Sequence, residues 1–181
     1  MDDLTEDIVL QAARGDVEAF ENIYKHYSAF VYNVALRMLK NIENAQEVTQ
    51  DVFVTLYRKL ETFRFESSLK TWIYRITMNT AINYAKKVSR IQDRTVEFDA
   101  NRYPAASPSK VISQDQLQKR IDALLSVLNP DQKACVILRS LEGLSYEEIA
   151  STLNININTV RSRLKRAREK MLSIKEEVMN L

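Results

Sequence analysis

The stretch LSYEEIASTLNININTVRSRLKRAR, residues 144–168, predicts a helix-turn-helix. Ser145 can cap the first helix, and Glu148, three residues later, completes a capping box. Asn154 stands where the chain must turn, and asparagine tolerates the left-handed backbone conformation better than most residues other than glycine. Asn156 can then cap the second helix. Two short capped helices separated by a tight turn are the arrangement that reads duplex DNA.

The second helix of this motif carries a dense run of cations. When Val160 and Leu164 are buried at a spacing of four, the basic side chains remain largely outside: Arg161, Arg163, Lys165, Arg166, Arg168 and Lys170. A basic helix face is often only solvated and paired with nearby acids. Here Glu169 is the sole acid within the run. We therefore interpret this helix as a reader of the DNA major groove.

Charge is distributed unevenly along the chain of 181 residues, whose formal net charge is +2. Residues 1–22 hold several carboxylates and only Arg14 as a base, whereas 58–90 and 161–170 are rich in lysine and arginine. Such asymmetry indicates separate surfaces for separate partners. The length suffices for one large domain or for two small ones.

The single cysteine, Cys135, excludes a disulfide within the chain and a zinc site built from several cysteines. Its apolar neighbours Val136, Ile137 and Leu138 favour a small core residue over a redox sensor. No apolar run approaches the length of a membrane span, and the acidic N-terminus is unlike a signal peptide. We expect a cytoplasmic protein that does not insert into membranes.

The sequence has two glycines and three prolines, so long helices should dominate and the fold should be all-α. Pro104 and Pro108 stand in a stretch without periodicity, which predicts a flexible linker over about 93–112. Two small helical domains, residues 1–92 and 113–181, should flank it. In the second, Asn129 followed by Pro130 fits a cap and a first helical turn.

The first domain reads as four helices. The first ends at Gly15, the second spans about 16–40, the third starts near Asn44, and the fourth spans about 68–87. We expect the third to bury Val48, Val52, Leu56 and Leu60, and the fourth to bury Leu69, Ile73, Ile76 and Tyr84.

A second face of the fourth helix carries Trp72, Arg75, Asn79 and Lys86. The loop before it adds Phe63, Arg64, Phe65 and Ser67. A lone tryptophan is more often a core residue than a ligand-binding one. A stacking plane with cations and an amide, however, is the set of groups that holds unpaired bases and their phosphates. A pocket for a base flipped out of a duplex has a similar lining.

Three segments together resemble the extracytoplasmic-function family of RNA polymerase sigma factors. SSLKTWIYRITMN, residues 67–79, resembles the family's promoter-melting segment, and AQEVTQDVF, residues 45–53, resembles its core-polymerase-binding helix. EGLSYEEIA, residues 142–150, with TVRSRL, residues 159–164, resembles its second DNA-binding domain. The match covers nearly the whole chain in the family's order, and only the linker is generic.

The resemblance implies a dissociable specificity subunit of bacterial RNA polymerase, with a four-helix sigma-2-type domain and a helix-turn-helix sigma-4-type domain. Its partners would be core RNA polymerase, promoter DNA and an anti-sigma factor, with no cofactor, small-molecule substrate or catalysis. The polymerase would be bound by Glu47, Gln50 and Asp51. The −35 element would be read as duplex by Thr159, Arg161, Ser162, Arg163, Lys165 and Arg166. The melted −10 element would be held by Phe63, Arg64, Phe65, Ser67, Trp72, Arg75, Asn79 and Lys86.

The chain departs from the family pattern at three places, one of which is Asn158, where a small residue is frequent. Housekeeping sigma factors have adjacent tryptophans where this chain has Trp72 followed by Ile73, so strand separation would depend on one large aromatic ring. Asn154 replaces the usual turn glycine, and we expect it to adopt the left-handed conformation.

Two other classes of protein are alternatives to this family. A transcriptional regulator that binds an operator without polymerase would explain residues 141–170, but not the aromatic and basic groups of the fourth helix. An enzyme acting on nucleic acid would need a catalytic group. The only histidine, His26, has no carboxylate pair at metal-binding spacing, and no nucleophile elbow or phosphate loop is present.

Overall fold

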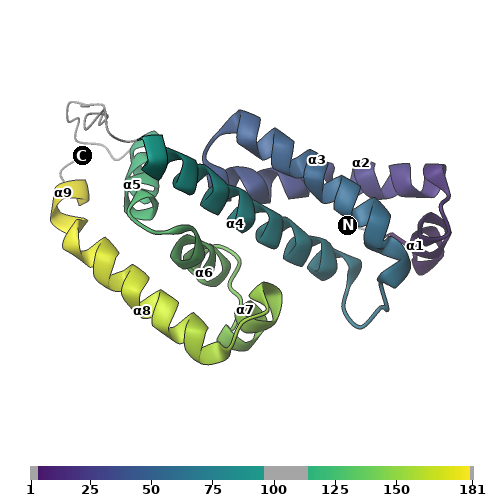
Figure 1. Ribbon diagram of the computed structural model, residues 1–181. Coiled ribbons are helices and arrows are strands. Elements are labelled where there is room, and N and C mark those ends of the chain that lie inside the picture. The colour runs from purple at the N-terminus through teal and green to yellow at the C-terminus, as the bar shows by residue number, and fades with distance from the viewer. Residues whose placement is uncertain (1–3, 96–113, 180–181) are drawn as a thin grey trace. The chain divides into compact units, whose positions relative to one another are not determined.

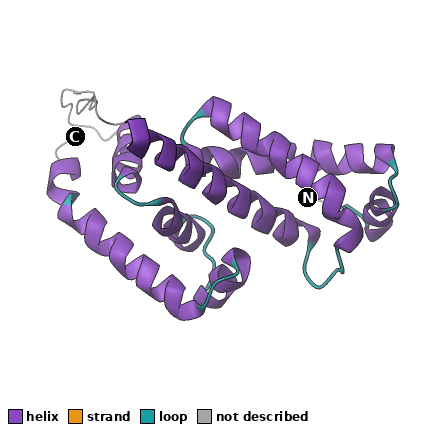
Figure 2. Cartoon of the chain, viewed as in Figure 1, coloured by secondary structure: helices purple, strands orange, loops and turns teal. Residues whose placement is uncertain are grey.

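A computed structural model describes residues 4–95 and 114–179, which form helices joined by loops and contain no strand (Figure 2). The helices are α1 (Glu6–Ala13), α2 (Val17–Leu39), α3 (Ile42–Lys59), the 3₁₀ turn η1 (Leu60–Thr62), α4 (Leu69–Thr95), α5 (Gln114–Ser126), α6 (Pro130–Ser140), α7 (Tyr146–Leu153), α8 (Ile157–Ser173) and α9 (Lys175–Met179) (Figure 1). The all-α prediction is confirmed. None of the described helices is both long and apolar enough to span a membrane.

The chain divides into two compact units, Met1–Ala85 and Lys86–Leu181. In the first unit, α2 and α3 lie side by side (Figure 1). The side chain of Asp16 caps α2 by accepting the N–H of Ala19 at 2.9 Å, and Lys40 ends that helix in the left-handed conformation, with φ 56°. The buried stripe predicted for the third helix is confirmed: Val48, Val52, Leu56 and Leu60 are all at most 2% exposed.

The predicted buried face of the fourth helix is wrong in part. Ile73 is fully buried as expected, but Leu69, Ile76 and Tyr84 are only half-buried. The buried stripe of α4 consists of Ile73, Tyr74, Thr77, Met78, Ala81 and Ile82. Because Thr77 is polar, the pattern of apolar residues in the sequence does not indicate this buried stripe. The hydroxyl of Thr77 donates to the carbonyl of Ile73 at 2.8 Å, which satisfies the group inside the core.

Two helix ends also differ from the sequence prediction. α3 begins at Ile42 rather than near Asn44, because the side chain of Asn41 accepts the N–H of Asn44 at 2.8 Å and caps the helix earlier. α4 continues to Thr95, three residues into the range predicted as linker. The remaining linker range, 96–112, lies outside the described residues.

In the second unit, side-chain caps fix the residues at which the helices of the helix-turn-helix domain begin. Asn129 and Ser145 each form a complete capping box, with Gln132 and Glu148 respectively. The N–H of Ser145 donates to Glu148 and holds the pKa of that carboxyl below its usual range. Asn154 adopts the left-handed conformation, with φ 52° and ψ 51°. These predictions for the motif are confirmed.

The core of the second unit joins α6, α7 and α8. Ile149 and Val160 are fully buried, Leu153 is 7% exposed, and Leu164 is half-buried. Cys135 is fully buried, as expected of a core residue. This packing holds α8 against α6 and α7, and leaves the opposite face of α8 in solvent.

Candidate functional site

The loop between η1 and α4 builds an aromatic cluster at the start of α4. The ring of Phe63 lies 4.7 Å from that of Phe65 and 5.1 Å from that of Trp72, measured between ring centroids. Phe65 has a φ of 56° and a side chain that is 39% exposed. A bulky residue rarely adopts this backbone conformation, and such positions concentrate at ligand-binding sites. The cluster therefore presents stacking surface in a strained loop.

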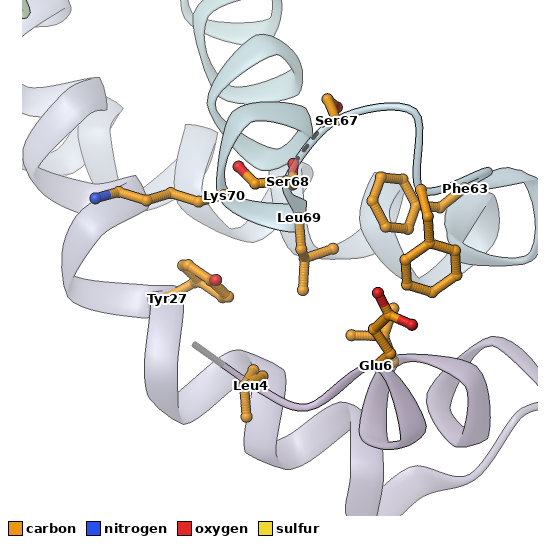
Figure 3. A pocket seen from close by; sticks show the side chains of 10 residues that line it. Leu4, Glu6, Tyr27, Phe63, Ser67, Ser68, Leu69 and Lys70 are labelled. Atoms are coloured by element: carbon orange, nitrogen blue, oxygen red, sulfur yellow. Dashed lines mark hydrogen bonds between the residues drawn. The ribbon is translucent and has the colours of Figure 1, made fainter. Parts of the chain in front are cut away.

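A pocket of about 310 Å³ opens beside this loop. Its walls come from the start of the chain and α1, from α2, and from the loop and first turn of α4: Leu4, Glu6, Val9, Tyr27, Phe63, Phe65, Ser67, Ser68, Leu69 and Lys70. Figure 3 places Phe63 and Leu69 opposite Leu4 and Glu6. The pocket combines rings and aliphatic groups with two hydroxyls, a carboxylate and an ammonium group, which suits a planar ligand with polar edges.

The other residues predicted to hold single-stranded DNA lie in the same loop or along α4. Arg64 and Ser67 are exposed. Trp72, Arg75 and Asn79 are each half-buried, as expected of residues beside rather than within the core stripe. Lys86 belongs to the second compact unit, where its Nζ atom lies 2.8 Å from Asp131 Oδ2. The loop and the first turns of α4 thus bring most of this predicted set together.

The residues predicted to bind polymerase, Glu47, Gln50 and Asp51, are all exposed on α3, while Val48 and Val52 between them are buried. Glu47 also has a partner that the sequence prediction missed. The hydroxyl of Tyr84 donates to Glu47 Oε2 at 2.7 Å. The two residues are 37 positions apart, so no local spacing could indicate the contact.

On α8, Arg161, Lys165 and Arg166 are exposed, as predicted for DNA-reading residues. Thr159 and Ser162 are half-buried, and the hydroxyl of Ser162 donates to the carbonyl of Thr159 at 2.9 Å. Lys165 lies 4.0 Å from Glu169, a loose pair between highly exposed side chains. The exposed face of α8 thus keeps its cations available to a polyanion.

The prediction that Arg163 lies largely outside is wrong. Its side chain is only 23% exposed, and its Nη2 atom lies 3.2 Å from Asp131 Oδ1 on α6. Asp131 is 32 residues away in sequence, so the local charge pattern around Arg163 does not indicate this pairing. Arg163 thereby joins α8 to the first turn of α6.

Arg163 also contacts the buried Cys135. Burial raises the pKa of the Cys135 thiol above its usual range, and the Arg163 guanidinium beside it opposes part of that shift. The thiol is therefore neutral at physiological pH and shielded from solvent.

Arg163→Ala is expected to uncover Cys135 and to weaken the second unit. Removing the guanidinium deprives Asp131 of one partner and should lower the free energy of unfolding by about 1 kcal/mol. Urea unfolding and the rate at which Cys135 reacts with Ellman's reagent measure the two effects. Arg161→Ala is the matched control, because Arg161 is exposed and should change neither. Equal thiol reactivity in both variants would contradict a role for Arg163 between α8 and α6.

Comparisons with known proteins agree with this arrangement. The family description "Sigma-70 region 2" matches residues 23–91, and "Sigma-70, region 4" matches residues 118–171. The RNA polymerase sigma-H factor of Pseudomonas aeruginosa is 33% identical over 171 residues, covering 90% of this chain and 89% of the relative. The ECF RNA polymerase sigma-E factor of Escherichia coli K12 is 31% identical over 176 residues, covering 92% of each.

Among solved structures, the sigma factor RpoE of Bartonella quintana, in complex with the anti-sigma factor NepR, has a TM-score of 0.61 and 25% identity. The match covers 88% of this chain and 98% of that chain. The two sequence alignments cover nearly the whole length of both relatives. The two family regions occur along the chain in the predicted order. The chain belongs to the extracytoplasmic-function family of RNA polymerase sigma factors, which bind core RNA polymerase and promoter DNA to start transcription.

Proposed function

We propose that three surfaces of this sigma factor divide the work of promoter recognition and polymerase docking. The observation that supports the proposal is the placement of the exposed predicted residues. One group lies on α3, one around the loop 63–68, and one on α8. Each surface has a different chemistry: carboxylates and an amide on α3, aromatic rings beside a pocket in the loop, and cations on α8. The three chemistries suit a protein partner, unpaired bases and duplex DNA, respectively.

The exposed face of α8 reads the −35 element in the major groove. The exposed side chains of Arg161, Lys165 and Arg166 divide between base edges and phosphates, although Arg161 also donates to Asn158. Thr159 and Ser162 lie in the first two turns of α8. Arg163 contributes from a fixed position, because Asp131 holds it. The unit from about residue 113 to 181 is the −35-binding domain.

The loop 63–68 and the start of α4 hold the melted −10 strand. Phe63, Phe65 and Trp72 offer rings on which bases stack, and the neighbouring pocket accepts a base turned out of the strand. Arg64, Ser67, Arg75 and Asn79 supply hydrogen bonds and positive charge for the backbone. Lys86, the other residue predicted for this role, belongs to the second unit and pairs with Asp131. The unit from residue 1 to about 92 is the −10-binding domain, and the linker follows α4, which ends at Thr95.

The exposed face of α3 docks on core RNA polymerase through Glu47, Gln50 and Asp51. Two carboxylates and an amide on adjacent turns can pair with basic side chains of the largest subunit. As in its family, the sigma factor selects the promoter, and bond formation remains with the polymerase. The protein therefore acts as an initiation factor in the cytoplasm, where polymerase and chromosome lie.

An anti-sigma factor controls this protein by covering its working surfaces. The Bartonella relative, similar over 88% of this chain, was solved with an anti-sigma factor bound. Affinity capture from the native cell, before and after stress, is the direct test of this part of the proposal. A small protein that is captured only before stress and that blocks polymerase binding would support it, and polymerase capture that is equal in both states would contradict it.

Arg161→Ala is expected to weaken binding of the holoenzyme to −35 duplex more than to random duplex of equal length. A good base-edge contact discriminates against the wrong base by about 1–3 kcal/mol, or roughly fivefold to 150-fold. Fluorescence anisotropy at fixed salt measures both affinities. Arg168→Ala, another exposed cation of α8, is the control for lost charge. If both duplexes weaken equally, Arg161 contacts the phosphate backbone instead.

Phe65→Ala is expected to impair melting of the −10 element while leaving duplex binding intact. Stacking of a base on an aromatic ring contributes about 1–3 kcal/mol, so the open complex should become several-fold less populated. Permanganate reactivity of −10 thymines in the holoenzyme complex measures the melted fraction. Tyr24→Ala removes a ring of α2 that is 47% exposed, against 39% for Phe65, and should have no such effect. Unchanged reactivity in the Phe65 variant would remove the loop from the −10 site.

Replacing Glu47, Gln50 and Asp51 together by alanine is expected to abolish association with core polymerase and to leave the fold intact. Co-purification with tagged core enzyme measures binding, and circular dichroism on heating measures folding. The control is the triple alanine variant of Glu18, Glu21 and Asn22, exposed residues of α2 that also include two carboxylates. Normal association of the α3 variant would overturn the docking assignment.

A further inference from the structure

Tyr84 of α4 reaches across to the docking face of α3. Its hydroxyl lies 2.7 Å from Glu47 Oε2 and 3.1 Å from Asn44 Oδ1. A phenol has a single proton, and the short contact with a charged carboxylate makes the stronger hydrogen bond. Tyr84 thus donates to Glu47, the carboxylate that we assign to polymerase binding.

The surroundings of Tyr84 keep it in the donating form. The hydrogen bond to Glu47 raises the pKa of Tyr84 above its usual range, and burial and the negative charges of Glu47 and Asp51 act in the same direction. The phenol is therefore protonated throughout the physiological range. The Tyr84 hydroxyl therefore holds Oε2 of Glu47, the accepting oxygen, at a constant position on the surface of α3.

An exposed glutamate ordinarily explores several rotamers and loses that freedom when a partner binds. Ordering such a side chain weakens an association by roughly twofold to tenfold. Tyr84 imposes the order before binding, because it fixes Oε2. Oε1, which has no other partner among the described residues, remains available to a cation of the partner.

We propose that Tyr84 is a positioning residue for polymerase docking: it holds Glu47 in the conformation that binds core RNA polymerase. This rests on the proposed docking of α3. The hydrogen bond to Glu47 comes from the hydroxyl of Tyr84, and the side chain as a whole is half-buried. The hydroxyl and the ring can therefore be tested separately.

Tyr84→Phe removes the hydroxyl and keeps the ring. We expect the full-length variant to bind core RNA polymerase about twofold to tenfold more weakly, with an unchanged thermal unfolding midpoint. Titration of labelled protein with core enzyme gives the affinity. If the role of Tyr84 were purely structural, Tyr84→Phe would lower the unfolding midpoint. Its effect on binding would then be the same with and without the carboxylate of Glu47.

A double-mutant cycle distinguishes the possible outcomes. If Tyr84 acts through Glu47, Tyr84→Phe should weaken binding in the native background and have no further effect beside Glu47→Ala. Beside Asp51→Asn, a control on the same face without a hydrogen bond to Tyr84, its effect should persist in full.

Three outcomes would contradict the positioning role of Tyr84. If Glu47→Ala itself leaves binding unchanged, the docking assignment fails, and this inference fails with it. If Glu47→Ala weakens binding but Tyr84→Phe has no effect or tightens it, docking stands and the positioning role is wrong. Additive effects of Tyr84→Phe and Glu47→Ala would also overturn the positioning role.

Discussion

The angle between α7 and α8 depends on one residue, Asn154, which turns the chain in the left-handed conformation. The side-chain caps of Ser145 and Asn156 then start the two helices on either side of the turn. An extended conformation at Asn154 would point α8 away from α6 and α7 and expose Val160, which is fully buried. The direction in which the cations of α8 face DNA thus follows from one backbone conformation. Asparagine adopts it with less strain than other residues that carry a Cβ atom.

The three proposed surfaces share one feature: on each, a neighbouring side chain orders a charged or aromatic group. Asp131 holds Arg163, Tyr84 holds Glu47, and Phe63 packs against both Phe65 and Trp72. Each contact reduces the conformational freedom that binding would otherwise remove. The remaining cations of α8, such as Arg166, stay exposed, which suits long-range attraction to DNA.

The sequence predicts the local structure well, because caps and periodicity are local signals. Ser145, Asn154 and the stripe of α3 follow from spacing alone. One error comes from a polar residue that is satisfied within its own helix, and the others arise where distant segments meet. The buried face of α4 depends on Thr77, whose hydroxyl is satisfied within its own helix, and Arg163 finds its acid on another helix. The Tyr84–Glu47 hydrogen bond likewise joins two helices, and no pattern along one helix indicates it.

Transcription by core polymerase in the presence of the purified protein tests the central claim most directly. Run-off reactions on a library of fragments from the native genome, followed by mapping of transcript 5′ ends, reveal where initiation occurs. We expect transcripts that need both proteins and that start downstream of a shared pair of −35 and −10 sequences. Tight binding of the protein alone to a palindromic duplex, with no transcript added by core polymerase, would contradict it.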